Sequence, residues 1–311
     1  MLCFEQYFFE VVLMGNILSR KQFDILEILA EEKQMLTQRI LAEKSNHSLG
    51  TVNRVVRELS VLGYMNDKGV TEAGIAALEP YRVKRAVFIA AGFGSRLVPV
   101  TLNTPKPLVR VNGKRIIDGL IDAVLEAGIN EIYIVRGYLA EQFDQLLYKY
   151  PMIKFIDNHD YNSANNISSA MCARELLGSA YVFEADLLIH NPKIVRKYHY
   201  TSNFLGIKKA RSDDWCFTAP DGIITSQTVG GLDCYQEVGI SFWNDEDGKK
   251  LADHIKLTFE MPGGRERYWD QVPFVFFPDE YKVEIRECLE TDIVEIDTFT
   301  ELKEIDKAYD V

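Results

Sequence analysis

Apolar residues recur at helical spacing three times in the first part of the chain. The three stripes run over 17–29, 37–42 and 49–62. Stripes of this kind are typical of amphipathic helices. Residues 63–71 then indicate a strand, a turn and a second strand, and 73–78 indicate a short closing helix. The pattern therefore predicts three helices followed by a small hairpin and one more helix.

A different pattern begins at residue 86, where short apolar runs alternate with helical stripes. The runs that indicate buried strands are 86–91, 131–136, 153–156 and 180–184. The helical stripes between them are 116–127, 140–150 and 165–177. Strands that alternate with helices predict an α/β fold with a doubly wound, mostly parallel sheet. From residue 204 onward we expect shorter strands and turns.

The two patterns meet at residues 79–85. Pro80 ends the last helix of the first part, and a basic run leads into the first strand of the second. With 311 residues the chain is long enough for two domains. We therefore predict a small first domain of residues 1–82 and a second domain of residues 83–311.

Composition narrows the class of protein. The net charge of −11 argues against a general nucleic-acid coat, although a local patch can still bind DNA. The five cysteines are scattered without a C-x-x-C, so we expect reduced thiols and a cytoplasmic protein. No apolar stretch approaches the length of a membrane span, so we expect no membrane partner. The apolar opening, residues 1–15, contains Glu5 and Glu10 without a basic start, which favours a helix or an extended segment over a signal peptide.

The most informative stretch follows the first strand of the second domain. This strand ends in the glycine loop, Gly92-Phe93-Gly94-Ser95-Arg96, and Lys106 follows it. Glycines let a ligand approach the backbone, and the N–H groups of such a loop form an anion-binding concavity. Arg96 adds a fork of donors that suits phosphate oxygens, and Lys106 adds a point charge. We therefore predict a site for a nucleoside triphosphate.

Three known phosphate-binding motifs can be compared with this loop. No Walker sequence occurs, and Leu97 stands where the dinucleotide fingerprint needs its third glycine. The string that fits is A-A-G-x-G-[ST]-R-L-x-P-x-T followed by P-K, which resembles the nucleotidyltransferases that activate sugar phosphates and choline phosphate. The resemblance implies a Rossmann-like nucleotidyltransferase fold, with Lys106 and Arg96 as catalytic residues. The nucleotide-binding residues that it implies are Ala90, Ala91, Gly92, Gly94, Ser95, Arg96, Gly137 and Tyr138.

Two acidic positions extend the resemblance to a metal site. Asp186 follows the strand in VFEAD, and Asp297 follows the later apolar alternation in IVEID. Magnesium prefers one or two carboxylates together with phosphate oxygens and water. The resemblance therefore implies that Asp186 and Asp297 hold Mg²⁺. The alternative is that each is a solvated acid at the end of a strand.

Aromatic residues cluster after residue 204, and a trimethylammonium group is held by aromatic faces and nearby carboxylates because it donates no hydrogen bond. The segments DDWCF and RYWDQV resemble those that hold choline in bacterial CTP:phosphocholine cytidylyltransferases, a family to which nearly all of 86–311 is similar. The substrate-binding residues so implied are Asn165, Trp215, Tyr268, Trp269 and Asp270. For Trp243 we expect a core position, which is the usual fate of a tryptophan. Glu237 could also face the site, although no motif supports it.

The reaction that the resemblance implies is transfer of CMP from CTP to phosphocholine with release of pyrophosphate. Gly92 and Gly94 would present N–H groups to the triphosphate. Arg96 would neutralise the leaving pyrophosphate, and Lys106 would bridge the α-phosphate and the incoming phosphate. The chain departs from the family at Val98, which replaces a basic residue often found there.

The first domain resembles the winged helix-turn-helix domains of bacterial regulators, with 36–65 matching their reading helix and wing. Its function does not follow from that resemblance, because residues 1–85 carry 11 basic and 11 acidic residues. The predicted reading helix offers Asn53, Arg54 and Arg57 as a thin phosphate-binding face. Two hypotheses stay open: weak DNA binding by an autoregulator, or dimerisation or docking, which includes a homodimer.

Rival functions for the whole chain also stay open. The same fold can act on a sugar 1-phosphate, phosphoethanolamine or another alcohol phosphate, and a sugar site needs hydrogen-bonding groups in place of aromatic faces. A transcription regulator could use the second domain only to sense a nucleotide, although intact Lys106, Asp186 and Asp297 argue against a dead enzyme. A third alternative is a scaffold that docks a choline kinase through the winged helix.

Overall fold

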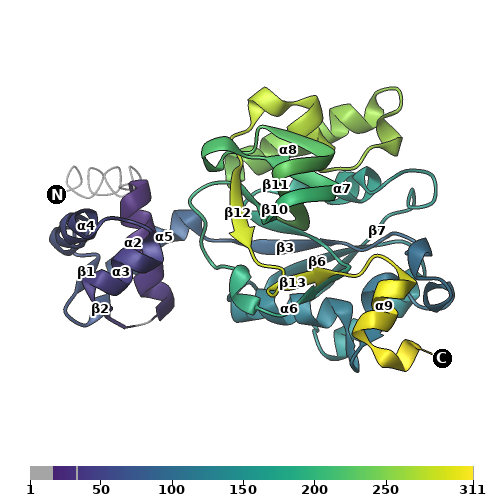
Figure 1. Ribbon diagram of the computed structural model, residues 1–311, viewed down its shortest axis with the longest axis horizontal. Coiled ribbons are helices and arrows are strands. Elements are labelled where there is room, and N and C mark those ends of the chain that lie inside the picture. The colour runs from purple at the N-terminus through teal and green to yellow at the C-terminus, as the bar shows by residue number, and fades with distance from the viewer. Residues whose placement is uncertain (1–16, 33, 311) are drawn as a thin grey trace, which may run out of the picture. The chain divides into compact units, whose positions relative to one another are not determined.

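The computed structural model describes residues 17–32 and 34–310 of the chain (Figure 1). The backbone divides into two compact units, one ending at Arg82 and the other beginning at Val83. The helix or extended segment expected over residues 1–15 lies outside the described residues. No helix of the described part is both long and apolar enough to cross a membrane.

The first unit is a helical bundle with a two-stranded wing. Its elements are α2 (Arg20–Glu32), α3 (Gln38–Ser45), α4 (Leu49–Val61), β1 (Met65–Asn66), β2 (Gly69–Val70) and α5 (Glu72–Leu78). Thr37 and Ser48 cap α3 and α4, because each side chain accepts an N–H of the first helical turn. The apolar stripes predicted for these helices form the core, in which Leu26, Val55 and Leu59 are buried. The predicted order of helices and hairpin is therefore confirmed.

The second unit is built on a seven-stranded sheet. Its strands are β3 (Arg85–Ile89), β6 (Glu131–Arg136), β7 (Lys154–Asp157), β8 (Ala180–Glu184), β10 (Asn203–Thr218), β11 (Ser226–Trp243) and β12 (Glu284–Cys288). Their order across the sheet is β12-β10-β11-β8-β3-β6-β7. Among these strands β11 alone runs antiparallel to its neighbours. The predicted α/β fold with a mostly parallel sheet is confirmed.

Helices cover both faces of this sheet (Figure 1). On one face, α6 (Ile116–Glu126) and the 3₁₀ segment Ala140–Tyr148 share a core with Phe88 and Phe183. On the other face, α7 (Ile167–Ala173) and α8 (Asp245–Glu260) share a core with Val182. Each strand of the centre is thus buried on two sides, which explains why the sequence shows continuous apolar runs there.

The part after residue 204 differs from the prediction of shorter strands and turns. β10 has 16 residues and β11 has 18, and together they form one long antiparallel hairpin. The middle of β10 is largely exposed, so it lacks the apolar run by which the other strands were found. α8, which the sequence reading missed, follows directly on β11.

A small second sheet ties the C-terminal segment to the centre of the unit. β9 (Leu187–Ile189) pairs antiparallel with β13 (Ile293–Glu295), and α9 (Phe299–Ile305) follows. Leu302 of α9 is buried in one cluster with Leu97, just after the glycine loop. This cluster fixes the C-terminal segment against the loop predicted to bind the nucleotide.

Candidate active site

The glycine loop leaves the carboxyl end of β3, at the edge of the sheet where ligands of such folds bind. Gly94 has a φ of +62°, and a Cβ on it would lie 2.9 Å from the Cβ of Lys106. Gly92 has neither constraint, since a Cβ there would meet nothing within 4 Å. Of the two glycines, therefore, Gly94 is the one that the conformation of the loop requires, and Gly92 leaves open space beside the loop.

A pocket opens beside this loop. It is lined by Ile89, Ala90, Gly92, Gly94, Ser95, Arg96, Lys106, Pro107, Asn166, Glu184, Ala185, Asp186 and Asp297. Of the predicted nucleotide-binding residues, Ala90, Gly92, Gly94, Ser95 and Arg96 thus face one space. The structure therefore brings together residues from the loop, from the end of β8 and from the C-terminal segment.

Gly137, Tyr138 and Ala91 hold the loop and are not among the residues that line the pocket. The Tyr138 N–H donates to the Ala91 carbonyl at 3.0 Å, and the Tyr138 hydroxyl donates to the carbonyls of Thr101 and Leu102. A Cβ on Gly137 would lie 2.7 Å from the side chain of Tyr161. These contacts give the three residues a supporting role for the loop, and their binding of the nucleotide stays a prediction.

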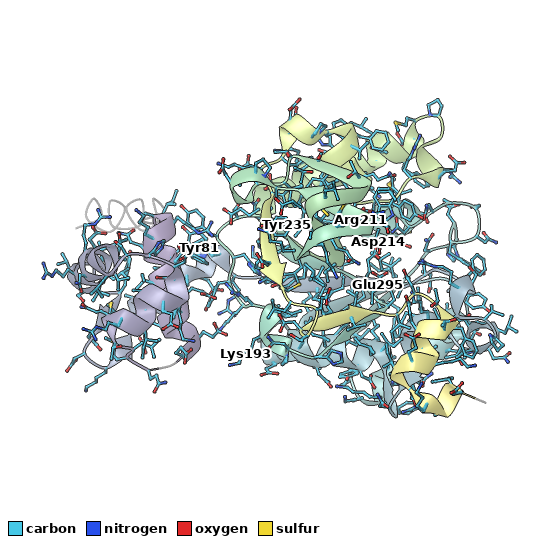
Figure 2. The ribbon with its side chains drawn as sticks, viewed as in Figure 1. Tyr81, Lys193, Arg211, Asp214, Tyr235 and Glu295 are labelled. Carbon is cyan, nitrogen blue, oxygen red and sulfur yellow. The ribbon has the colours of Figure 1, made fainter. Side chains whose placement is uncertain are left out.

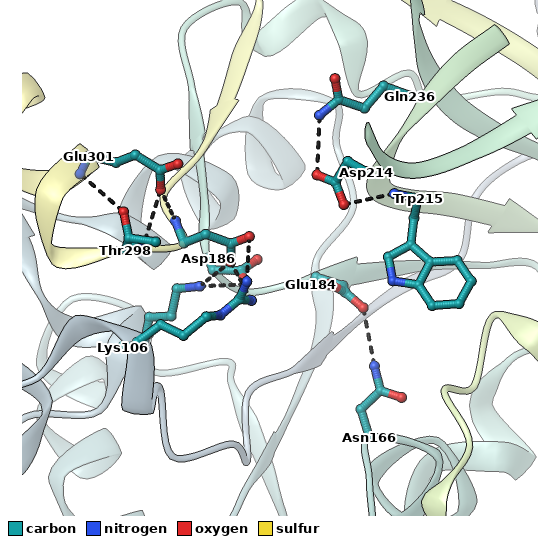
Figure 3. A network of polar contacts seen from close by, with 11 residues as sticks. Lys106, Asn166, Glu184, Asp186, Asp214, Trp215, Gln236, Thr298 and Glu301 are labelled. Carbon is teal, nitrogen blue, oxygen red and sulfur yellow. Dashed lines mark hydrogen bonds and ion pairs between the residues drawn. The ribbon is translucent and has the colours of Figure 1, made fainter. Parts of the chain in front are cut away.

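Lys106 joins two carboxylates at the floor of the pocket (Figure 3). Its Nζ lies 2.9 Å from Asp186 Oδ2 and 3.1 Å from Asp297 Oδ1. Burial opposes the charge, but Asp186 and Asp297 outweigh it and raise the pKa of Lys106 above the ordinary lysine value. Arg96 binds Asp297 with both guanidinium arms, at 2.6 and 2.9 Å. The pocket therefore holds two positive groups, of the kind that suits phosphate oxygens.

The chain brings Asp186 and Asp297 together by pairing β9 with β13. The Ile296 N–H donates to the Asp186 carbonyl at 3.2 Å, one residue before Asp297. Glu301 then accepts the N–H groups of Asp297 and Thr298, both at 2.8 Å, and forms a capping box with Thr298 at the start of α9. Asp297 lies 201 residues after Arg96 of the glycine loop in sequence. Its position is fixed by the capping box of α9 and by the pairing of β9 with β13.

The acids best placed for a metal are Glu184, Asp186 and Glu295, whose carboxylate oxygens lie within 4.8 Å of one another. Asp186 Oδ1 is buried and has no hydrogen-bond partner among the described residues. An all-oxygen set with one unpartnered oxygen fits a hard cation such as Mg²⁺. Asp297, which was predicted as the second ligand, forms ion pairs with Lys106 and Arg96, and its role in metal binding stays a prediction.

Sequence reasoning missed Glu184 and Glu295, although a signal for them was present. Each precedes a predicted acid by two residues, in E-A-D and E-I-D, and residues two apart in an extended chain share one face. Burial raises the pKa of Glu184 and Glu295 well above the ordinary value, and the neighbouring charge of Asp186 adds to the effect. Figure 2 labels Glu295 at this place.

The predicted Asn165 is not among the residues that line the pocket, whereas its neighbour Asn166 is. Both polar groups of the Asn165 side chain have partners in the protein. The amide donates to the Glu266 carbonyl, and the side-chain oxygen accepts the Asn166 N–H. Asn166 lines the pocket and donates to Glu184 Oε1 at 3.3 Å. Asn166 is therefore a further candidate site residue, and the role of Asn165 stays a prediction.

Of the predicted aromatic cage, Trp215 and Tyr268 lie at the surface and Trp269 does not. The rings of Trp215 and Tyr268 meet edge to face at 5.7 Å. Trp269 is 1% exposed and packs with Phe204 and Trp243 in the core. A buried ring offers no open face, so the assignment of Trp269 to the cage is corrected to a core position, the position expected for Trp243.

Asp270, the last predicted substrate residue, belongs to a buried polar group. Gln227 donates through Nε2 to Glu237 Oε2 at 2.8 Å and also to Asp270 Oδ2. Burial raises the pKa of both carboxyl groups, and for Glu237 the negative charge of Asp270 and Glu184 adds to the effect. We call Gln227, Glu237 and Asp270 the hairpin triad, because two of its members come from β11.

Comparison with known proteins agrees with this geometry. The family model described as "Nucleotidyl transferase" matches residues 85–204, and "Winged helix-turn-helix DNA-binding" matches residues 18–64. Over 228 residues the chain is 36% identical to the 2-aminoethylphosphonate cytidylyltransferase of Lancefieldella rimae. The match covers 72% of this chain and 92% of the relative. The chain belongs to the cytidylyltransferase family of nucleotidyl transferases.

A second relative and a solved structure, both from Streptococcus pneumoniae, belong to the same family. The cytidylyltransferase unit is 30% identical over 231 residues to the choline-phosphate cytidylyltransferase of Streptococcus pneumoniae, covering 72% of this chain and 97% of the relative. The solved structure of CTP:phosphocholine cytidylyltransferase from that organism superposes with a TM-score of 0.67 at 31% identity, over 73% of this chain and 99% of the other. The predicted membership of the cytidylyltransferase family is thus confirmed. The acceptors in the relatives' names differ, since one is 2-aminoethylphosphonate and the other is choline phosphate.

Proposed function

We propose that the chain transfers CMP from CTP to the phosphate or phosphonate of a small acceptor whose far end carries a cationic nitrogen. The observation that supports this most is the distribution of charge at the site. Lys106 and Arg96 stand beside the glycine loop, whereas Glu237 and Asp270 form no ion pair with any cation of the described residues. One end of the acceptor would thus meet cations, and the other end would meet acids.

The proposed reaction is an in-line displacement at the α-phosphorus of CTP. An acceptor oxygen forms the new bond to phosphorus, and the bond to the bridging oxygen breaks, so that pyrophosphate leaves with the electron pair. The N–H groups of Gly92 and Gly94 would hold the triphosphate, and Lys106 would contact both the α-phosphate and the incoming oxygen. Arg96 would exchange its bond to Asp297 for the pyrophosphate. Positioning and charge neutralisation carry the catalysis, because the protein forms no covalent intermediate.

Glu184, Asp186 and Glu295 would hold Mg²⁺, with Asp297 next to them. The ion would supply positive charge to the phosphate oxygens as negative charge develops there. When phosphates draw Lys106 and Arg96 toward themselves, Asp186 and Asp297 lose part of their present partners. The acids would then be available to the metal, which is consistent with the unpartnered Asp186 Oδ1.

Phosphocholine is the acceptor that the aromatic pair of half-buried Trp215 and exposed Tyr268 favours. Trp215 and Tyr268 can pack against a trimethylammonium group, and each such contact contributes about 0.5–2 kcal/mol. Figure 3 shows Trp215 and Asp214 across from Lys106 and Asp186, with Glu184 between the two groups. A second candidate is 2-aminoethylphosphonate, the acceptor in the name of the 36% identical relative, and the hairpin triad favours it.

The test is pyrophosphate release with Mg²⁺ from CTP, UTP, GTP, ATP and dTTP, each offered phosphocholine, phosphoethanolamine, 2-aminoethylphosphonate and glucose 1-phosphate. We expect release with CTP and the amine-bearing acceptors. Release only with glucose 1-phosphate would discard the cationic acceptor. No release with any pair would favour a nucleotide-sensing regulator instead.

For the winged helix, DNA binding stays a proposal beside dimerisation or docking. Arg54 and Arg57 are exposed on α4, and Arg54 lies 3.8 Å from Glu58. A salt-dependent gel shift with DNA from the protein's own promoter region, lost on Arg54→Ala with Arg57→Ala, would support the DNA-binding alternative. A protein that forms homodimers and shifts no DNA would support the other.

A further inference from the structure

The hairpin triad contains a buried acceptor atom without a donor. Gln227 is 6% exposed, and both hydrogen atoms of its amide are engaged by the neighbouring carboxylates Glu237 and Asp270. Its carbonyl oxygen, Oε1, is buried and has no hydrogen-bond partner among the described residues. Buried polar atoms are normally paired, so an orphan of this kind points to a missing donor.

The surroundings of this oxygen define what the donor must be. Two carboxylates flank Gln227, and within the described chain neither forms an ion pair with a lysine or arginine. Glu184, which lines the catalytic pocket, adds negative charge that Glu237 senses. A group that carries both a positive charge and N–H bonds would satisfy the carboxylates and Oε1 together. A primary ammonium has three such bonds, and a trimethylammonium group has none.

The backbone holds Gln227 and Glu237 in place. β11 is irregular where it passes the end of β10, so that Phe217 pairs with Gln227 at one point of the strand and with Tyr235 at another. Gln227 and Glu237, ten positions apart in sequence, are therefore brought within hydrogen-bond distance, 2.8 Å. Because both lie in paired strands, the triad is positioned before any ligand arrives.

We propose that Gln227, together with Glu237 and Asp270, binds the ammonium of the acceptor through its N–H bonds and selects a primary amine over a quaternary one. This inference rests on the proposed CMP transfer and sharpens it. The Gln227 carbonyl and the two carboxylates accept the N–H groups. Each methyl group added to the nitrogen removes one donor, so that the trimethyl compound leaves Oε1 unpaired in the complex as well.

The test uses the full chain with CTP, Mg²⁺ and the methylation series from phosphoethanolamine through its monomethyl and dimethyl derivatives to phosphocholine. We expect kcat/KM to fall along the series, at least about tenfold from the first to the last, because a site built for N–H donors rejects analogues that lack them. Rates that are equal or that rise with methylation would overturn the inference and leave the proposed function standing. No turnover with any of the four, nor with 2-aminoethylphosphonate, would remove the proposed function itself.

Two variants locate the effect at the triad. Gln227→Met keeps the length of the side chain and removes the carbonyl, so it should narrow the ratio of kcat/KM between phosphoethanolamine and phosphocholine. Glu237→Gln should act in the same direction and serves if the first variant fails to fold. Gln145→Met, at an exposed position bonded to Arg115, is the matched control and should leave the ratio unchanged. An unchanged ratio in folded Gln227→Met and Glu237→Gln would refute the assignment.

Discussion

The active site has a loop side, which contains Lys106 and Arg96, and a hairpin side, formed by the hairpin triad. The two sides differ in how their charged groups are paired. On the loop side, Lys106 and Arg96 pair with Asp186 and Asp297 at distances between 2.6 and 3.1 Å. On the hairpin side, Glu237 and Asp270 share one neutral amide. The carboxylates of the first side are paired with cations of the protein, whereas those of the second side form no ion pair within the described residues. The difference indicates where the anionic and the cationic ends of an acceptor belong.

The largest loss of activity is expected when the side chain of Lys106, on the loop side, is removed. We expect Lys106→Ala to lower kcat/KM by about 10²–10³-fold, the effect of removing one preorganised donor from a developing oxyanion. Steady-state pyrophosphate release measures it, with circular dichroism to show that the variant is folded. Lys249→Ala removes an exposed lysine that pairs with Asp245 and should keep the wild-type rate. A folded Lys106→Ala enzyme with nearly normal turnover would refute the role of this lysine.

The second largest effect is expected at the metal acids. Asp186→Asn should lower turnover by about 10–100-fold, since a hydrogen bond to a charged group contributes about 1.5–3 kcal/mol. It should also raise the Mg²⁺ concentration needed for half-maximal rate, because the site loses one charge. Rates measured across a Mg²⁺ titration separate the two effects, and exposed Asp279→Asn is the control. An unchanged Mg²⁺ dependence would argue that Asp186 serves Lys106 alone.

The two loop glycines give a smaller and sharper test. Gly94→Ala should lower the free energy of unfolding by about 1–2 kcal/mol, because alanine disfavours a φ of +62°. Its Cβ would also press on Lys106, so activity should fall. Gly92→Ala should leave the unfolding free energy unchanged, since nothing lies within 4 Å of its Cβ. Equal losses of stability in urea denaturation would contradict this assignment.

The smallest effect is a pH dependence that belongs to the hairpin side. The raised pKa of Glu237 means that the folded protein keeps a proton that the unfolded chain has already lost, so stability falls as pH rises above the ordinary glutamate pKa. Glu237→Gln should make this fall between pH 5 and 8 smaller, while the raised pKa values of Asp270, Glu184 and Glu295 maintain part of it. Urea denaturation at both pH values measures it. Exposed Glu175→Gln should keep the wild-type slope, and the same slope in Glu237→Gln would exclude this contribution.

The loop side could be predicted from the sequence because its parts are short and contiguous. Residues 90–96 follow one apolar strand, and Lys106 follows within the same motif. Asp186 ends another apolar run, so its place at the carboxyl edge of the sheet follows from the fold. The metal acids were predicted only in part, because Glu184 and Glu295 were missed, and the role of Asp297 in metal binding stays a prediction.

The hairpin side could not be predicted in the same way. Gln227 and Glu237 meet because β11 changes register against β10, and no local pattern announces such a change. Trp269 and Asp270 were both predicted from the segment RYWDQV, but Trp269 is buried in the core. Asn165 and Asn166 differ only in which side chain turns toward the pocket, a matter of backbone direction at the start of α7.

The most direct test compares two acceptors that differ only in the amine. Pyrophosphate release from CTP and Mg²⁺ is measured with 2-aminoethylphosphonate and with ethylphosphonate, which has the same phosphonate and no cation. An acid-lined hairpin side predicts rapid release with 2-aminoethylphosphonate and little with ethylphosphonate. Equal rates with the two would contradict the claim that this side of the site binds a cation.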